Sequence, residues 1–470
     1  MQHKNILILI FKTNLIYSMK QFFLPLFLLA AVNIFAKDLD PINVLQAFVE
    51  VDTVNPPGNE TNAVNFYANI FDQYGIEYKT AESAPGRGNI WARVKGGNLP
   101  ALMLLQHTDV VPSDEEYWET NPMKGTFKDG YLYGRGVIDM KGLGVAHLFA
   151  FIDAFKNREK LNRDIVFMAT ADEEAGGFYG AGWMLENHPE AFEGVGLLLN
   201  EGGSGTTYGE KQIFSVEVTQ KVPVWLRLKS EGSPGHGSSP QTSSAVTQLI
   251  EALNNLYDNP FNARIIPPVD TYFKALAIDM DGAEQKAFSN MSLAIMKDNF
   301  LESLQESSPS WHALTRDTCS ITMLEGSSKI NVVPPVAFAE VDCRMLPDRA
   351  VAEFIQDFNE RVSPFNIKTE LIMAFGPAIS STTSELFKAI EKVTKNEYPN
   401  SRVIPAVSTG FTDSHFTREI GIESYGFNPM LFESGEFRGV HGNNERVKID
   451  AYKRSIKDLQ LIIEEVAYKD

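Results

Sequence analysis

Three short apolar runs in the first half of the chain each end in ionisable residues. They are ALMLLQHTD (101–109), DIVFMATADEE (164–174) and GVGLLLNEGG (194–203). Apolar runs without polar alternation are typical of strands buried on both faces of a mostly parallel sheet. Ligands of open α/β sheets bind beyond the carboxyl ends of such strands. The pattern therefore predicts an α/β fold in which the polar groups after three strands converge on one site.

The pattern changes from about Val222. Polar and apolar residues alternate in VPVWLRLKSEG, TCSITMLEG and VAFAEVDCRML, as in half-exposed strands. Near Ser380 the chain returns to an amphipathic helical pattern, which resembles that of residues 42–52 and 61–75. We therefore predict one domain formed by residues 37–221 and 380–470, with a smaller α+β domain inserted at 222–379.

The composition is that of a globular, acidic protein. Asp and Glu number 60 against 42 Lys and Arg, which gives a net charge of −18. Nucleic-acid binding requires basic surfaces, so this charge argues against a nucleic-acid partner.

The N-terminus has the pattern of a signal peptide. Lys20 precedes the apolar segment QFFLPLFLLAAVNIFA, which ends at Ala36. We expect cleavage after residues 1–36, export to the periplasm or the medium, and no stable membrane contact afterwards; translation starts at Met1 or Met19. The alternative is an N-terminal membrane anchor that also uses the earlier run NILILIFKTNLIY, which a lysine interrupts.

The two cysteines, Cys319 and Cys343, lie in two strand-like runs. An exported protein can join such residues in a cross-strand disulfide. We favour the alternative that both are small core residues.

The residues after the apolar runs form a candidate metal site. His107 can bind a metal through one ring nitrogen while Asp109 fixes its tautomer. Asp139 lies in a glycine-rich loop, and further ligands come from elsewhere in the chain: Glu174, Glu201 and His441. This set of oxygen and nitrogen ligands suits zinc. Five ligands serve two ions if one carboxylate bridges them, with the ions about 3.5–4 Å apart.

The adjacent acids Glu173 and Glu174 have different predicted roles. If Glu174 binds metal, Glu173 remains free beside it as a general base. Taken singly, the pair could be a solvated turn, His107 a structural histidine and Asp139 a helix cap. Their joint occurrence at strand ends favours the metal site. His147, on an apolar helix, is predicted to be a core residue instead.

Seven segments resemble metallopeptidase family 20, the family of aminoacylase, carboxypeptidase G, carboxypeptidase S and succinyl-diaminopimelate desuccinylase. They are LLQHTDVVP, DGYLYGRGVIDMKG, ATADEEAGG, LLNEGG, GSPGHGSSP, KINVVPPVAFAEVDCRMLPD and GVHGNNERV. The resemblance runs in order across nearly the whole chain after the leader. It implies a di-zinc catalytic domain with an inserted lid domain through which a homodimer forms.

The resemblance also implies a role for each matched residue. Asp139 would bridge the ions, Glu174 and His441 would complete one zinc, and His107 and Glu201 the other. Glu173 would be the base that later protonates the leaving amine. Four more residues would act on substrate: His236 on the oxyanion, Asn331 and Arg344 by holding the substrate (the Arg344 fork suits a carboxylate), and Gly410 by a backbone contact.

The sequence departs from the family pattern at two positions and in one segment. Asn200 stands where relatives usually carry aspartate, and His415 where close relatives often have arginine, which leaves the substrate preference open. The stretch from about Ile278 to His312 is longer than a minimal lid requires, so we expect extra helices there.

We therefore expect a zinc hydrolase, with Co²⁺ or Mn²⁺ as substitutes, that cleaves an amide bond in small peptides or N-acyl amino acids with a free carboxylate. One alternative is an aminopeptidase on the same scaffold. The other is a non-catalytic, zinc-dependent binding protein.

Overall fold

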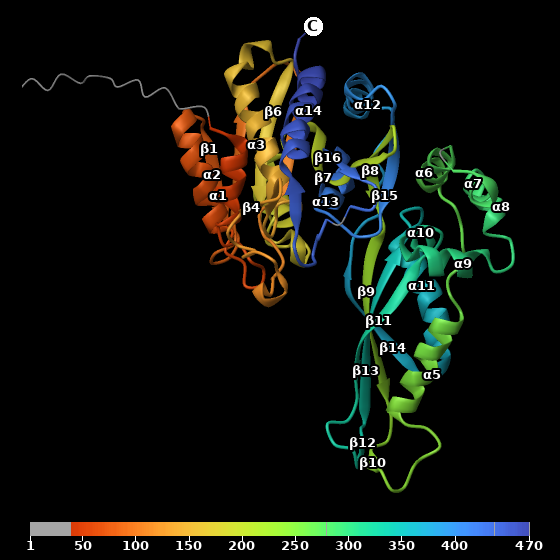
Figure 1. Cartoon of the computed structure of the whole chain (residues 1–470). Coiled ribbons are helices and arrows are strands. Elements are labelled where there is room, and N and C mark those ends of the chain that lie inside the picture. Colours follow the sequence, from red (N-terminus) through yellow and green to blue (C-terminus); the bar gives the residue numbers. More distant parts are fainter. Residues whose placement is uncertain (1–38, 279, 437, 470) are drawn as a thin grey trace, which may run out of the picture. The chain divides into compact units, whose positions relative to one another are not determined.

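An eight-stranded mixed sheet forms the framework of the candidate site (Figure 1). In spatial order its strands are β1 (Tyr78–Glu82), β2 (Gly88–Val94), β6 (Arg163–Thr170), β3 (Leu99–His107), β7 (Val195–Tyr208), β16 (Glu423–Glu433), β8 (Lys211–Gln220) and β15 (Ser401–Ser408). β3 is parallel to β6 and β7, β7 is parallel to β16, and β8 is parallel to β15. The predicted mostly parallel α/β sheet is therefore confirmed.

The computed structural model describes residues 39–278, 280–436 and 438–469. The predicted signal peptide at 1–36, together with the choice between Met1 and Met19, lies outside the described residues. No helix within these three ranges combines the length and the apolar character needed to cross a membrane.

The central strand β3 is buried on both faces. Leu102 and Leu104 lie in a core shared with the helices on one side of the sheet, whereas Met103 and Leu105 pack in a second core with Met184. The helices of the first side are α1 (Pro41–Val49), α2 (Thr61–Tyr74), α3 (Lys141–Lys156), α12 (Glu385–Glu397) and α14 (Ile449–Ala467); α4 (Ala181–Asn187) lies on the second. This two-sided burial explains why the strand sequences do not alternate.

Local signals set the ends of the first helices. The side chain of Asp40 accepts hydrogen bonds from the backbone N–H groups of Ile42 and Asn43, both at 3.0 Å, and Pro41 occupies the first turn of α1. α2 ends at Gly75, whose φ of 66° is readily adopted only by a residue without a Cβ.

A second, four-stranded sheet is antiparallel throughout. Its order is β11 (Thr318–Glu325), β13 (Val336–Met345), β9 (Val222–Glu231) and β14 (Ile367–Ala374), and α5 (Ala245–Asp258) and α11 (Val351–Val362) share its core. Every second residue of β13 is buried, as the sequence alternation predicts. The sheet lies within the predicted insertion, but the boundaries at 222 and 379 stay predictions because Leu39–Asp470 forms one compact unit.

The two cysteines form a disulfide, so the favoured interpretation of two separate core residues is wrong. Cys319 of β11 pairs directly with Cys343 of β13, and their Cα atoms lie 4.0 Å apart. Antiparallel register brought the two side chains face to face, which spacing along the chain does not reveal.

Among the described residues, five helices lie between α5 and β11 in sequence, and the last four occupy the stretch from about Ile278 to His312 where extra helices were expected. They are α6 (Pro267–Ala277), α7 (Gly282–Phe288), α8 (Met291–Ala294), α9 (Phe300–Ser307) and α10 (Pro309–Ala313). Ile404 and Val407 of the edge strand β15 share a core with these helices, which therefore cover one end of the large sheet.

Two small sheets and several short turns complete the fold. β17 (Arg446–Lys448) pairs with β5 (Tyr131–Tyr133), which pairs with β4 (Thr126–Lys128), while β10 (Gly235–His236) pairs with β12 (Val332–Val333). The remaining short helices are η1 (Glu115–Tyr117), η2 (Arg158–Lys160), η3 (Glu173–Ala175), η4 (Pro189–Ala191), α13 (Ser414–Glu419) and η5 (Ser363–Phe365). The β5–β17 pairing brings the C-terminal GVHGNNERV segment beside the loop that carries Asp139.

Candidate metal centre and active site

The ends of three neighbouring strands bring the predicted ligands together. His107 is the last residue of β3, and its Nε2 lies 3.5 Å from Oε1 of Glu201 on β7 and 4.0 Å from Oε2 of Glu173, in the turn η3 after β6. The same nitrogen lies 3.1 Å from Oδ1 of Asp139. The convergence expected from the three apolar runs is therefore present.

His441 joins this cluster from the C-terminal part of the chain. Its Nε2 lies 3.0 Å from Oδ2 of Asp139 and 3.1 Å from Oε2 of Glu174. Asp139 therefore faces His107 with one oxygen and His441 with the other, the arrangement required of a carboxylate that bridges two ions. The structure places all five predicted ligands in one cluster, with Glu173 beside them.

The chemistry of this cluster fits metal ions. Two groups can each enclose a cation, His107 with Asp139 and Glu174, and His107 with Glu173 and Glu201; the ligand atoms of each group lie within 4.8 Å of one another. Oε1 of Glu174 is buried, and no hydrogen-bond partner for it lies among the described residues. Buried polar atoms are almost always satisfied, so this oxygen fits the role of a metal ligand. Two histidines with three carboxylates are ligands that zinc accepts.

Burial and mutual repulsion raise the pKa of three carboxylates of the cluster. Burial, and then the charge of Glu201, raise the pKa of Glu173 well above its usual value. Burial also raises the pKa of Glu174, and that of Glu201 to about 7. Hydrogen bonds with Asp139 and Glu174 raise the pKa of His441 to about 10. The cluster thus carries a surplus of negative charge, which bound divalent cations would offset.

Asp109 orients both His107 and the turn that carries the two adjacent acids. Nδ1 of His107 lies 3.1 Å from the backbone oxygen of Asp109 and 3.4 Å from Oδ1. The same carboxylate accepts hydrogen bonds from the backbone N–H groups of Glu173 and Glu174, both at 3.2 Å, and from Asn55 Nδ2 at 2.8 Å. The turn is therefore held by the residue predicted to fix the histidine tautomer.

Sequence reasoning missed Glu445, which is fully buried next to the cluster. Its carboxylate accepts hydrogen bonds from the backbone N–H groups of Gly136, Ile138 and Asp139, and from Nη1 of Arg135. The available signal was its position in GVHGNNERV, four residues after His441. Glu445 thereby ties the loop of one predicted ligand to the loop of another.

The cluster opens into a cavity of about 270 Å³. Besides the acids and His441, it is lined by Ile138, Leu143, Gly202, Gly203, Ser204, Ser408, Phe411, Thr412, Asn428, Phe432, Arg438 and Val440. Apolar side chains and hydroxyl groups therefore both face a molecule bound beside the acids. Arg438, three residues before His441, is a second residue that sequence reasoning missed.

The four residues predicted to bind substrate from the lid or its neighbourhood do not line this cavity. His236 is exposed on β10, where its Nδ1 contacts Ser238 Oγ at 2.8 Å, and Asn331 is exposed beside β12. Gly410 is exposed next to the lining residue Phe411. Within this chain, the metal cluster and the predicted oxyanion histidine are therefore not assembled into one site.

Arg344 is held within the smaller sheet. Its Nε and Nη2 donate to the two oxygens of Asp342 at 2.8 and 3.1 Å. Its guanidinium lies 5.3 Å from the ring centre of Phe411. The edge of the Arg344 guanidinium that carries Nε and Nη2 is therefore already paired with the carboxylate of Asp342.

The two departures from the family pattern lie behind the cavity. Asn200 donates to Ser414 Oγ at 3.1 Å, and His415 is buried with its ring stacked on Phe375 at 3.5 Å. Phe411 and Thr412 of the same segment line the cavity, but His415 does not. An effect of His415 on substrate would therefore be indirect.

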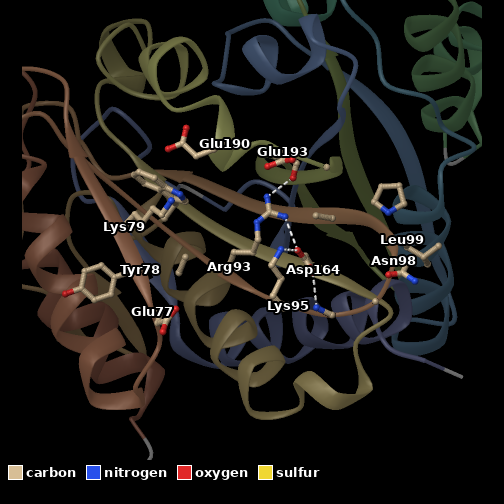
Figure 2. A pocket seen from close by; sticks show the side chains of 17 residues that line it. Glu77, Tyr78, Lys79, Arg93, Lys95, Asn98, Leu99, Asp164, Glu190 and Glu193 are labelled. Atoms are coloured by element: carbon tan, nitrogen blue, oxygen red, sulfur yellow. Dashed lines mark hydrogen bonds and ion pairs between the residues drawn. The ribbon is translucent and has the colours of Figure 1, made fainter.

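A larger cavity, of about 1000 Å³, lies elsewhere, beside β1, β2 and the start of β3 (Figure 2). Its central cations are paired: Asp164 lies 3.1 Å from Arg93 and 2.8 Å from Lys95. Arg93 also donates to the backbone oxygens of Ala191 and Glu193. Neither group of candidate metal ligands lines this cavity, so the volume of a cavity does not by itself identify the candidate active site.

Comparison with known proteins shows the family and the fold of the chain. The family model described as "Peptidase family M20/M25/M40" matches residues 103–465 of the chain. N-fatty-acyl-amino acid synthase/hydrolase PM20D1 of Mus musculus is 28% identical over 77% of this chain and 73% of its own length. Probable carboxypeptidase S-like 2 of Dictyostelium discoideum is 29% identical over 76% and 70%. The solved structure of the M20 family metallo-carboxypeptidase Sso-CP2 from Sulfolobus solfataricus has the same fold, with a TM-score of 0.70, 19% identity and coverage of 91% and 99%.

Proposed function

From the premise that the chain belongs to peptidase family M20/M25/M40, we propose that it is a di-zinc hydrolase of amide bonds. Its substrates are small peptides or N-acyl amino acids with a free carboxylate. The observation that carries this proposal is the position of Glu173, which is buried beside the five predicted ligands, with its Oε2 4.0 Å from Nε2 of His107. A free carboxylate at such a position is what general-base hydrolysis requires.

The residues present would hold two ions. His107 and Glu201 would bind one, Glu174 and His441 the other, and Asp139 both. When bound, zinc supplies Lewis-acid chemistry, which polarises a carbonyl group and makes water more acidic.

Glu173 would move the proton. Its carboxylate takes a proton from the attacking water and gives it to the nitrogen of the leaving amine as the amide bond breaks. Burial raises the pKa of Glu173, which favours a group that can hold the proton between these two steps. Asp109 keeps the base in place through the backbone N–H of Glu173.

Relatives and cavity lining support the substrate class. The name of one relative refers to N-fatty-acyl-amino acids and that of another to carboxypeptidase activity. The cavity offers Leu143, Phe411 and Phe432 to an apolar acyl or side chain. Both substrate classes have an amide bond one residue away from a free carboxylate, so one site serves either.

A second copy of the chain would complete the site. His236 is exposed and lines no part of the cavity. The edge strand β11 exposes Ile321, Met323 and Leu324 to solvent, a surface that another copy can cover. We therefore include in the proposal a homodimer formed through the smaller sheet, in which His236 acts on the partner's substrate.

Export is the proposed location. The signal-peptide pattern supports it, and so does the disulfide between Cys319 and Cys343, because disulfides persist in oxidising compartments.

Hydrolysis by zinc-loaded protein (residues 37–470) tests the function. The panel contains dipeptides, their N-acetylated forms and N-acyl amino acids with short and long chains. We expect chelator-sensitive cleavage that Glu173→Gln abolishes without loss of bound zinc, whereas Glu302→Gln, an exposed carboxylate on α9, retains activity. Cleavage confined to free α-amines would indicate an aminopeptidase. Full activity of Glu173→Gln would overturn the mechanism, and zinc binding without any cleavage would indicate a binding protein.

A further inference from the structure

Arg438 lies in the loop between β16 and β17 with its guanidinium held on three sides. Nη1 donates to Ser204 Oγ and Nη2 to Thr206 Oγ1, both at 3.2 Å. The guanidinium carbon lies 3.9 Å from the ring centre of Phe432, a stacked cation–π contact. These contacts fix the orientation of a side chain that would otherwise be flexible.

The guanidinium shares a cavity with the metal cluster. Arg438, Glu173 and Glu201 all line it, and no other lysine or arginine does so among the described residues. Within the described ranges, no carboxylate lies at ion-pair distance from Arg438. Its two hydrogen bonds go to neutral hydroxyl groups, so a guanidinium with five N–H donors keeps several for a ligand.

Partial burial of the positively charged Arg438 guanidinium is unfavourable unless an anion binds to it. It lowers the pKa of the Arg438 guanidinium from its usual value. Charged groups taken out of water are normally paired, and a bound carboxylate would pair this one bidentately.

The spacing suits a small substrate. Ser204, which holds the guanidinium, follows Glu201 by three positions in β7. Three residues of a strand span on the order of 10 Å. One amino-acid unit and its carboxylate–guanidinium contact together bridge such a distance between the predicted metal ligands and the Arg438 guanidinium.

We infer that Arg438 anchors the free carboxylate of the substrate, held in place by Ser204, Thr206 and Phe432. The inference rests on the proposed function and names the group that selects for its substrate class. It differs from the expectation for Arg344, whose fork is engaged by Asp342.

The test measures binding separately from turnover. Zinc-loaded Glu173→Gln protein is titrated calorimetrically with N-acetyl-leucine and with N-acetyl-leucine amide, which differ only in the terminal charge. Adding Arg438→Gln should weaken binding of the acid about 10- to 100-fold, as expected for loss of a charge-assisted hydrogen bond. Binding of the amide should not change. Arg438→Lys, which keeps the charge and loses the fork, should lie between.

Arg361→Gln is the matched control. Its guanidinium also lies over an aromatic ring, 4.2 Å from the ring centre of Phe261, but it belongs to α11 and lines no part of the cavity. It should leave both affinities unchanged. Arg344→Gln in the same background shows which of the two arginines gives the preference for the acid.

Three results would overturn the inference. The first is equal loss of affinity for acid and amide in both Arg438→Gln and Arg438→Lys, which would make Arg438 a structural residue. The second is a preference for the acid that survives both variants. The third is the absence of that preference from the parent protein. Cleavage is measured separately, with protein that retains Glu173. If that protein cleaves neither compound but the Arg438-dependent preference for the acid is present, the proposed hydrolysis fails and the carboxylate anchor stands. If it cleaves the acid and the variants keep that preference, the anchor fails and the hydrolysis stands.

Discussion

The carboxylate of Glu445 accepts a hydrogen bond from the backbone N–H of Asp139 at 3.1 Å. The same carboxylate also accepts from Ile138 at 2.8 Å and from Gly136 at 3.0 Å. Since Glu445 lies four residues after His441, one buried side chain connects two loops that carry predicted metal ligands.

Glu445→Gln should therefore weaken metal binding. The glutamine side chain would present its own N–H groups to the backbone N–H donors. Some of the hydrogen bonds that hold the Asp139 loop would therefore be lost, while the volume of the side chain is kept. Groups that orient metal ligands typically contribute 10- to 100-fold in affinity, and we expect about that loss. Zinc retained after dialysis against graded chelator measures it. Glu397→Gln, an ion-paired carboxylate near α14, is the control, and equal zinc retention in both variants would contradict the prediction.

His147 should make the protein sensitive to acid. It is fully buried in α3, as predicted, and its Nδ1 lies 2.8 Å from Gln106 Oε1. Burial lowers the pKa of its imidazole from 6.5 to about 3. Between these values the unfolded chain binds a proton that the folded chain does not, so stability falls as the pH decreases through this window.

The variant His147→Gln removes this proton and keeps a hydrogen-bonding side chain. The free energy of unfolding of the wild type should fall by about 3 kcal/mol more than that of the variant between pH 7 and pH 4. Urea denaturation at four pH values checks this. Parallel curves for the two proteins would show that His147 does not titrate on unfolding.

The Cys319–Cys343 disulfide should stabilise the smaller sheet. It joins β11 to β13 across a sequence separation of 24. Closing a loop of this length stabilises by about 3 kcal/mol in the chain-entropy description. The double variant Cys319→Ala/Cys343→Ala should lose about this much in urea denaturation. A reductant should destabilise the wild type and leave the double variant unaffected; a reductant-insensitive wild type would argue against the disulfide in solution.

The proposed exchange of His236 between copies predicts complementation. Glu173→Gln and His236→Ala should each be inactive alone. After mixing and subunit exchange, a mixed dimer has one site with an intact Glu173 and an intact His236 from the partner. Random pairing should restore about a quarter of the wild-type activity per site. Activity that stays at the level of the separate variants after verified exchange would place His236 in its own chain's site or outside catalysis.

The candidate site was predictable where its residues follow local signals. Buried parallel strands leave apolar runs in the sequence, and the groups that follow them, His107, Glu173 and Glu201, meet because such strands end at one edge of a sheet. Asp139 and His441 follow none of the three apolar runs; their residue types made them candidate ligands, and the family resemblance implied their roles. His441 is placed by the pairing of β17 with β5, two strands far apart in the sequence.

The sequence by itself therefore determined the class of sheet, the strand-end ligands and the helices, because each depends on patterns a few residues long. Only the tertiary structure decided the partners. It paired Cys319 with Cys343 and placed Glu445 against a backbone 306 residues away. It also placed Arg438 in the lining of the cavity that holds the acids, and paired Arg344 with Asp342. Such contacts depend on strand register and loop packing, and no local periodicity records which distant side chain fills a given position.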